Sequence, residues 1–214
     1  MSIQLDKVQP KNKAQLKSLI EYAFNHNIYD LNFIDTSEIT NMSWLFEYIS
    51  CNFDVSKWDV SNVKDMSYMF TYCFKFNCDL SNWDVSNVTD MKHLFNGCSI
   101  FIGKGLENWD VSNVTDMTCM FSRCKNFNCD LSNWDVSNVT YMEYMFNGCK
   151  NFNCDLSNWN VSNVTDMDNM FVNCKKFNCD LSDWDISNIT RWKNMFGGCD
   201  KMSIPNWYKL YHRK

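Results

Sequence analysis

Cysteine is the residue type in this sequence with the widest chemistry. The chain has 12 cysteines, and four Cys-x4-Cys pairs recur along it: Cys73/Cys78, Cys124/Cys129, Cys149/Cys154 and Cys174/Cys179. Three interpretations are open: small buried thiols that fill the core, a disulfide within each pair, or zinc held between neighbouring pairs. We favour buried thiols, because Cys98 and Cys199 lack a second cysteine five residues on and zinc ribbons use tighter spacings. We therefore expect neither a metal nor another cofactor.

Aspartate is the second recurrent residue that could carry chemistry. It follows the repeated tryptophan and forms a predicted acidic ladder: Asp59, Asp84, Asp110, Asp135 and Asp185, with Asn160 in the remaining repeat. Like charges directly opposite each other destabilise neighbouring strands, so the recurrence predicts compensating hydrogen bonds from the serine and asparagine of each repeat. The functional alternative is an acidic stripe that binds a basic partner or cations. Calcium is not expected, because the sequence lacks glycine-rich calcium-binding nonapeptides.

Histidine gives little support for catalysis. The sequence holds His26, His93 and His212, and none lies in a phosphate loop, a nucleophile elbow or a metal-binding pair. Cys119 and His93 occupy the same position of adjacent repeats, but a third group to orient such a couple is missing from the pattern. We therefore expect that the protein is not an enzyme.

These residues recur because the chain is built from repeats. The repeated tryptophans are spaced by 25, 26, 25, 25 and 25 residues: Trp58, Trp83, Trp109, Trp134, Trp159 and Trp184. This period is typical of solenoids and arrays, and its length suits one strand and one short helix. A degenerate unit precedes them, with Phe46 standing 24 residues before Phe70. We count seven coils.

The pattern within one repeat predicts its elements. Apolar residues at i, i+3, i+4 and i+7 (Met66, Met69, Phe70 and Cys73) indicate a two-turn helix. The threonine before each such segment is the expected N-cap: Thr89, Thr115, Thr140 and Thr165. Upstream, Trp83 and Val85 alternate with polar residues, which indicates a short half-buried strand.

The predicted fold is therefore α/β: a single right-handed leucine-rich-repeat-like solenoid of about seven 25-residue strand–helix coils with an N-terminal helical cap. We expect an N-terminal capping segment at 1–30, the repeat solenoid at 31–200 and a C-terminal cap at 201–214. Leu16, Leu19, Ile20 and Ala23 have helical spacing in the first cap, and Trp207, Leu210 and Tyr211 are expected to pack in the last.

The repeat also resembles a known family. The consensus "NWDVSNVTDMxxMFxxCxxFN" is similar to the BspA-like surface-protein repeat, a leucine-rich-repeat relative found in bacterial surface proteins, protists and giant viruses. The resemblance covers about residues 8–200. It implies a solenoid with an adhesion or interaction role and no defined activity.

Composition narrows the choice of partner. The formal net charge is −5, which argues weakly against nucleic acid as a partner. The sequence has neither an apolar run of membrane-spanning length nor the apolar core of a signal peptide near its start, so no membrane contact is expected. We expect a cytoplasmic location, or the virion or host cell for a viral protein.

One repeat carries an extra residue, in "CSIFIGKGLENW" between Cys98 and Trp109. An insertion inside a strand or helix would turn a core face outward. The sequence therefore predicts a bulge at the corner that leaves Trp109 in line with Trp83 and Trp134.

Aromatic residues mark the predicted contact surface. On a helical wheel, Trp44, Tyr48, Tyr68 and Tyr72 point away from the core on adjacent repeats, and clustered exposed rings favour an interaction site. The alternative is that these rings pack on the N-terminal segment or lie flat over the predicted helices. We expect a non-enzymatic repeat scaffold for protein–protein interaction, serving adhesion or binding of a host factor. A self-assembling structural protein, in which these four rings form a homo-oligomer contact, is the alternative.

Overall fold

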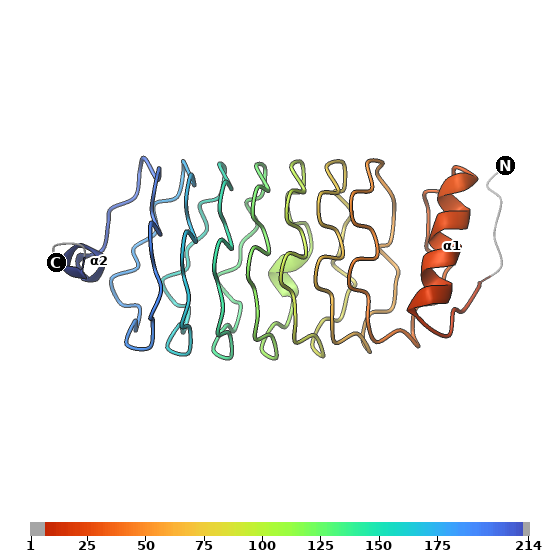
Figure 1. The fold of residues 1–214 in the computed structure, drawn as a ribbon, viewed down its shortest axis with the longest axis horizontal. Coiled ribbons are helices and arrows are strands. Elements are labelled where there is room, and N and C mark those ends of the chain that lie inside the picture. Colours follow the sequence, from red (N-terminus) through yellow and green to blue (C-terminus); the bar gives the residue numbers. More distant parts are fainter. Residues whose placement is uncertain (1–6, 212–214) are drawn as a thin grey trace.

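The repeats lie side by side between two terminal helices. The computed structural model describes residues 7–211. Helix α1 (Lys13–Asn25) lies at one end and α2 (Asn206–Tyr211) at the other, with the repeats arranged along the long axis between them (Figure 1). Asn12 caps α1 by accepting the Gln15 N–H at 3.0 Å, and Leu16, Ile20 and Ala23 of α1 are buried.

The prediction of an α/β, leucine-rich-repeat-like solenoid of strand–helix coils is wrong. Within residues 7–211, the repeats contain one short 3-10 helix, η1 (Leu106–Asn108), and otherwise consist of turns. Isolated parallel bridges replace a sheet, and they connect equivalent residues of successive repeats, such as Asp65 with Asp90 and Asp90 with Asp116. The segment upstream that was expected to be a strand is also irregular, although Trp83 and Val85 are buried as predicted.

Backbone hydrogen bonding explains why the expected helices do not form. In the segment 66–73, alternate N–H groups donate to the next repeat, as Tyr68 does to the Lys92 carbonyl at 2.9 Å and Phe70 to Leu94 at 2.9 Å. The intervening groups donate three residues back, as Met69 does to Met66 at 3.2 Å. An α-helix would use all of these donors internally. Successive turns leave half of them to hold the repeats together, which satisfies the buried backbone.

The core contains the residues that the spacing pointed inward. Met66, Met69, Phe70 and Cys73 are all fully buried. The phenylalanines at the position of Phe70 stack between repeats, with ring centroids 5.5 Å apart for Phe70 and Phe95. Thus the spacing identified the buried side of the segment correctly but not its backbone conformation.

Each repeat holds two residues with left-handed backbone, four positions apart. They form two columns along the stack: Trp44, Tyr68, His93, Cys119, Tyr144, Asn169 and Asn194 in one, and Tyr48, Tyr72, Gly97, Arg123, Gly148, Asn173 and Gly198 in the other. Only glycine, and less often asparagine, adopts this conformation at low cost. The left-handed residues turn the chain between its inward-facing residues and carry their own side chains on the surface.

The irregular repeat keeps its register. The Trp109 ring lies 6.2 Å from that of Trp83 with 2° between the planes, and the indole N–H of Trp109 donates to the Leu80 carbonyl as other tryptophans of the column do. The extra residue is absorbed by η1 and by Gly103 and Gly105, which have positive φ. The predicted bulge is therefore confirmed.

The C-terminal end is only partly as expected. The Trp207 indole donates to the Leu181 carbonyl at 2.9 Å, but Leu210 is 66% exposed and does not pack on the last repeat. The capping segments 1–30 and 201–214 include residues 1–6 and 212–214, which lie outside the described residues, as do His212 and the side chain of Tyr211. In the described part of the chain, no helix has the length and apolar character that crossing a bilayer requires.

Candidate functional site

Trp44, Tyr48, Tyr68 and Tyr72, here called the aromatic block, lie together on two adjacent repeats. The rings of Trp44 and Tyr68 are stacked with centroids 3.8 Å apart, and those of Tyr48 and Tyr72 are stacked at 5.2 Å. Trp44 is 46% and Tyr48 63% exposed, while the two tyrosines of the second repeat are partly buried. The structure thus brings the four predicted residues together, although by left-handed turns rather than by the outer face of helices.

The backbone at the aromatic block is strained. All four residues have φ between 57° and 61°, a region that bulky residues rarely adopt. Such a conformation costs on the order of 1–3 kcal/mol per residue. Later repeats avoid part of this cost, because several equivalent positions hold glycine or asparagine: Gly97, Gly148, Asn169, Asn173, Asn194 and Gly198. His93, Cys119, Arg123 and Tyr144 retain it.

Neighbouring residues hold the rings in place. His93 stacks on Tyr68 with ring centroids 4.4 Å apart. The Tyr72 hydroxyl accepts from Arg123 Nη1 at 3.2 Å, and its ring passes over Gly97, where a Cβ would stand 2.5 Å from Tyr72 Cδ1. Gly97 therefore provides the room that Tyr72 needs. Burial lowers the pKa of His93, with smaller effects of Asp116, Lys92 and Asp90, which favours the neutral ring in this stack.

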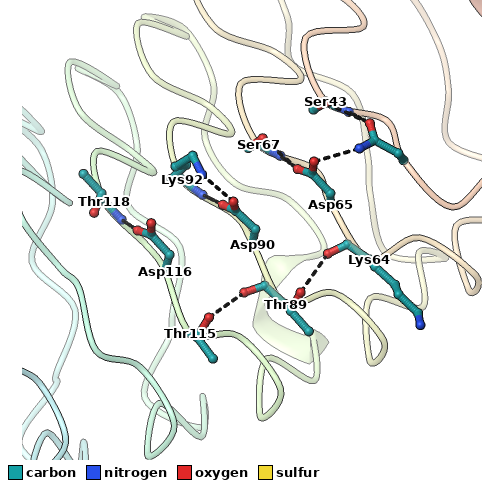
Figure 2. Close-up of polar contacts among 11 residues, drawn as sticks. Ser43, Lys64, Asp65, Ser67, Thr89, Asp90, Lys92, Thr115, Asp116 and Thr118 are labelled. Carbon is teal, nitrogen blue, oxygen red and sulfur yellow. Dashed lines mark hydrogen bonds and ion pairs between the residues drawn. The ribbon is translucent and has the colours of Figure 1, made fainter.

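A row of carboxylates runs along the repeats (Figure 2), and its first member, Asp65, stands three residues before Tyr68 of the aromatic block. Asp65, Asp90 and Asp116 stand at the bridge position of three successive repeats. Asp65 accepts from Asn41 Nδ2 at 2.8 Å, and Lys92 Nζ pairs with Asp90 at 2.5 Å. Two members of the row affect Tyr68: burial chiefly raises the pKa of Tyr68, Lys92 opposes this, and Asp90 and Asp116 add to it.

The predicted acidic ladder has a structural role. Asp59, Asp84, Asp110, Asp135 and Asp185 each accept a hydrogen bond from the N–H of the serine two residues on, at 3.0–3.1 Å, and Asn160 does so at 3.2 Å. The carboxylates therefore close Asx turns rather than lining a strand. Hydrogen bonds from Ser86 lower the pKa of Asp84, and the asparagine of each repeat bonds to its neighbour, as Asn87 does to the Ser61 carbonyl at 2.8 Å.

Sequence reasoning missed the wider use of this turn. A second set of Asp-x-Ser turns lies five residues earlier in the repeats: Asp79, Asp130, Asp155 and Asp180. The recurrent Asp-x-Ser spacing was the available signal. The predicted threonine N-caps are wrong, since the described repeats between α1 and α2 contain no α-helix. Thr115 Oγ1 instead donates to the Thr89 carbonyl, and Thr89 Oγ1 to the Lys64 carbonyl, each at 3.2 Å (Figure 2).

The 12 cysteines are free thiols. One column lies in the core, where Cys73 Sγ donates to the Phe46 carbonyl at 2.9 Å and Cys98 Sγ to Phe70 at 3.0 Å. A second column lies at a corner, where Cys78 Sγ is 3.4 Å from an Asp54 oxygen. Burial raises the pKa of Cys73 to about 12. This geometry fits the interpretation of buried thiols better than disulfides within the Cys-x4-Cys pairs.

His93 and Cys119 do lie on adjacent repeats, where the His93 N–H donates to the Thr118 carbonyl at 2.7 Å. However, burial raises the pKa of Cys119 to about 12, with Glu143 and Asp116 adding to the effect. A thiol nucleophile needs the opposite shift. The pair therefore lacks the character of a catalytic couple.

Two spans of the chain, residues 14–105 and 99–207, match the profile of one protein family, described as "Mycoplasma protein of unknown function, DUF285". The spans overlap at the irregular repeat, and together they include both left-handed columns. Searches found no matching curated protein and no matching solved structure.

Proposed function

This chain belongs to the DUF285 family of repeat proteins, and from that premise we propose that it is a non-enzymatic repeat scaffold for protein–protein interaction whose contact surface is the aromatic block. At the coarse level of a repeat family, the match agrees with the resemblance to BspA-like surface repeats. We extend the proposal to the role that this resemblance implies, which is adhesion or binding of a host factor.

Backbone strain at exposed aromatic residues is the observation that carries the proposal. Trp44 and Tyr48 have φ near 60° and remain substantially exposed, so the strain is not offset by full burial of their rings. Asparagine fits the same backbone position at residues 169, 173 and 194. Tyr144 is a single strained ring of this kind, whereas the aromatic block gathers four on two adjacent repeats. A sequence that clusters strained rings where asparagine would fit is under a constraint other than stability. Contact with a partner supplies such a constraint.

The block is also preorganised for binding. Stacking fixes Trp44 against Tyr68 and Tyr48 against Tyr72, so little side-chain entropy remains to be lost when a partner docks. Tyrosine and tryptophan are the residues that most often dominate binding energy at interfaces. The high pKa of the Cys119 thiol, beside His93, supports the non-enzymatic part of the proposal.

Photo-crosslinking in the native cell tests this function. A benzophenone amino acid at position 48 is expected to capture a discrete partner, which mass spectrometry then identifies. Tyr144 is the matched control position, because it has the same left-handed conformation, with φ of 55°, and is 36% exposed. Equal capture from positions 48 and 144 would contradict the proposal.

The same experiment distinguishes binding of a different protein from the alternative, a self-assembling structural protein. The exposed rings could also form the contact between copies. Self-assembly predicts that position 48 crosslinks to a second copy of this chain and that light scattering gives a mass that rises with concentration. A heterologous partner predicts a constant monomer mass for the purified protein.

A further inference from the structure

A second exposed apolar group adjoins the aromatic block. Phe74, Ile100 and Ile102, here called the apolar corner, are 50%, 43% and 48% exposed. The Phe74 ring lies 5.8 Å from that of Tyr72. Ser99 Oγ donates to the Phe74 carbonyl at 3.3 Å, so the segment that holds Phe74 lies beside the segment that holds Ile100 in the next repeat. The apolar surface therefore continues from the block around the edge of the repeats.

The apolar corner is a local departure from the repeat. Later repeats hold polar residues at its positions: Lys125, Lys150 and Lys175 for Phe74, Asn126 and Asn151 for Ile100, and Asn128, Asn153 and Asn178 for Ile102. Some of these asparagines stabilise the stack, since Asn128 Oδ1 accepts the Asn153 N–H at 2.8 Å and Asn153 Oδ1 the Asn178 N–H at 2.9 Å. Isoleucine at 102 cannot accept such a bond. As for the strained rings of the aromatic block, stability of the fold does not explain why isoleucine stands at position 102.

Acidic residues and apolar residues lie on different sides of the aromatic rings along the sequence. Along one repeat, Asp65 precedes Tyr68 and Tyr72, and Phe74 follows them. Asp65, Asp90 and Asp116 form one row (Figure 2) that precedes the left-handed positions along each repeat, and the apolar corner follows those positions. Lys92 already pairs with Asp90, so the carboxylates that a partner would meet are those of Asp65 and Asp116. A complementary partner must be apolar at its centre and positively charged along one side.

We propose that this combined surface binds a basic amphipathic helix of a partner protein, with its lysines or arginines over Asp65 and Asp116 and its apolar stripe over the aromatic block and the apolar corner. The proposal rests on the interaction role proposed above and names the class of partner. Repeats joined by backbone hydrogen bonds are about 4.8 Å apart, close to the helix pitch of about 5.4 Å. A helix lying along the stack can therefore place one side chain over each repeat.

A second copy of the chain fits less well. Each copy has a net charge of −5, and an isologous contact would bring the same acidic row near the interface from both sides. A basic segment neutralises that row instead.

Two labelled model peptides test the proposal by fluorescence anisotropy. Both are helix-forming, with about five turns and the same leucine and phenylalanine stripe; one carries lysine at the remaining positions and the other glutamate. The lysine peptide is expected to bind at least about tenfold more tightly than the glutamate peptide, and its affinity is expected to fall with added salt. Failure of the lysine peptide to bind, or equal binding of the two, would overturn the proposal.

Variants locate the binding with substitutions that the chain already uses elsewhere. Asp65→Asn with Asp116→Asn removes charge and keeps an Asx turn of the kind that Asn160 forms, and Phe74→Lys with Ile100→Asn restores residue types of later repeats. Each pair of substitutions is expected to lower the affinity for the lysine peptide about fivefold or more. Asp135→Asn with Asp185→Asn is the control for charge and is expected to have no effect.

The outcomes separate the two proposals. If Tyr48→Asn with Tyr68→Asn abolishes binding while the acidic and corner variants do not, the block is a contact surface but the basic amphipathic partner is wrong. If the control pair weakens binding as much as Asp65→Asn with Asp116→Asn, the peptide binds through charge in general and the proposal fails.

Discussion

Trp44 and Tyr68 stand 24 residues apart, yet their rings are parallel within 6° and their centroids lie 3.8 Å apart, while both backbones are left-handed. Two strained residues thus present a rigid pair of rings at the surface. The predictions below test whether that arrangement serves stability or binding.

Replacing strained rings with asparagine should not harm the fold. Tyr48→Asn relieves part of the left-handed strain and loses only a ring that is 63% exposed, so we expect the free energy of unfolding to stay the same or rise by up to about 1 kcal/mol. Urea denaturation measures this, with Tyr144→Asn as the control. A loss above about 2 kcal/mol would show that the ring belongs to the core.

Gly97 should be intolerant of a side chain because of Tyr72. Gly97→Ala and Gly148→Ala carry similar backbone costs, since φ is 81° and 76°. Only the first places its Cβ against the Tyr72 ring, whereas at Gly148 the nearest atom is 3.6 Å away. We expect Gly97→Ala to be more destabilising by about 1–2 kcal/mol, as measured by thermal or urea denaturation.

The matched rescue for this position is Tyr72→Asn. Adding it to Gly97→Ala should remove most of the difference between the two glycine variants. Equal destabilisation with and without Tyr72 would contradict the packing described.

Acid should destabilise the protein through its Asx turns. Hydrogen bonds from serine lower the pKa values of Asp84, Asp135 and Asp185 below the ordinary value of 3.8. The unfolded state therefore takes up these protons first, so the stability that the turns contribute is present above about pH 3.8 and is lost as pH falls through the folded-state values. Urea midpoints should fall below that pH, in addition to an earlier decrease below about pH 6.5 that the lowered pKa of His93 causes.

Asp84→Asn provides the control for the acid transition, because asparagine keeps the turn at Asn160 without a titrating group. The variant should lose stability less steeply with acid than the parent chain. An identical pH profile would show that this carboxylate does not contribute.

Most of the cysteines should react only after unfolding. Burial raises the pKa of Cys78, Cys129 and Cys154 to about 12, so the reactive thiolate is scarce in the folded protein. A thiol reagent without reductant should find few fast groups in the native state, drawn from the partly exposed Cys51, Cys119 and Cys199, and all 12 in denaturant. Fewer than 12 after unfolding would indicate disulfides, and a count that rises with chelator would indicate a metal.

Part of this structure could be predicted from the sequence. The spacing of Met66, Met69, Phe70 and Cys73 identified the buried residues, because a helix and a series of turns with a left-handed residue every four positions bury the same set. The backbone could not be inferred from Tyr68 or Tyr72. Its signal was elsewhere, in Gly148, Asn169 and Asn173 at the equivalent positions, since these residue types favour a left-handed conformation.

The candidate surface was likewise predicted only in part. The four rings of the aromatic block were expected to lie together and do so. Phe74 and Ile100 were missed, although each stands where a later repeat has a polar residue, Lys125 or Asn126. Comparing each repeat position along the stack, instead of reading one helical wheel, would have found them.

The affinity of the partner captured at position 48 tests most directly whether the aromatic block is the contact surface. It is measured for three purified chains: the parent, Tyr48→Asn with Tyr68→Asn, and Tyr144→Asn. Removing two rings from the centre of an interface should cost about 2 kcal/mol or more, which is roughly a 30-fold weaker Kd. We predict that loss for the double variant, with an unchanged melting temperature, and no change for Tyr144→Asn. Equal affinity of all three chains would contradict the assignment of the aromatic block as the contact surface.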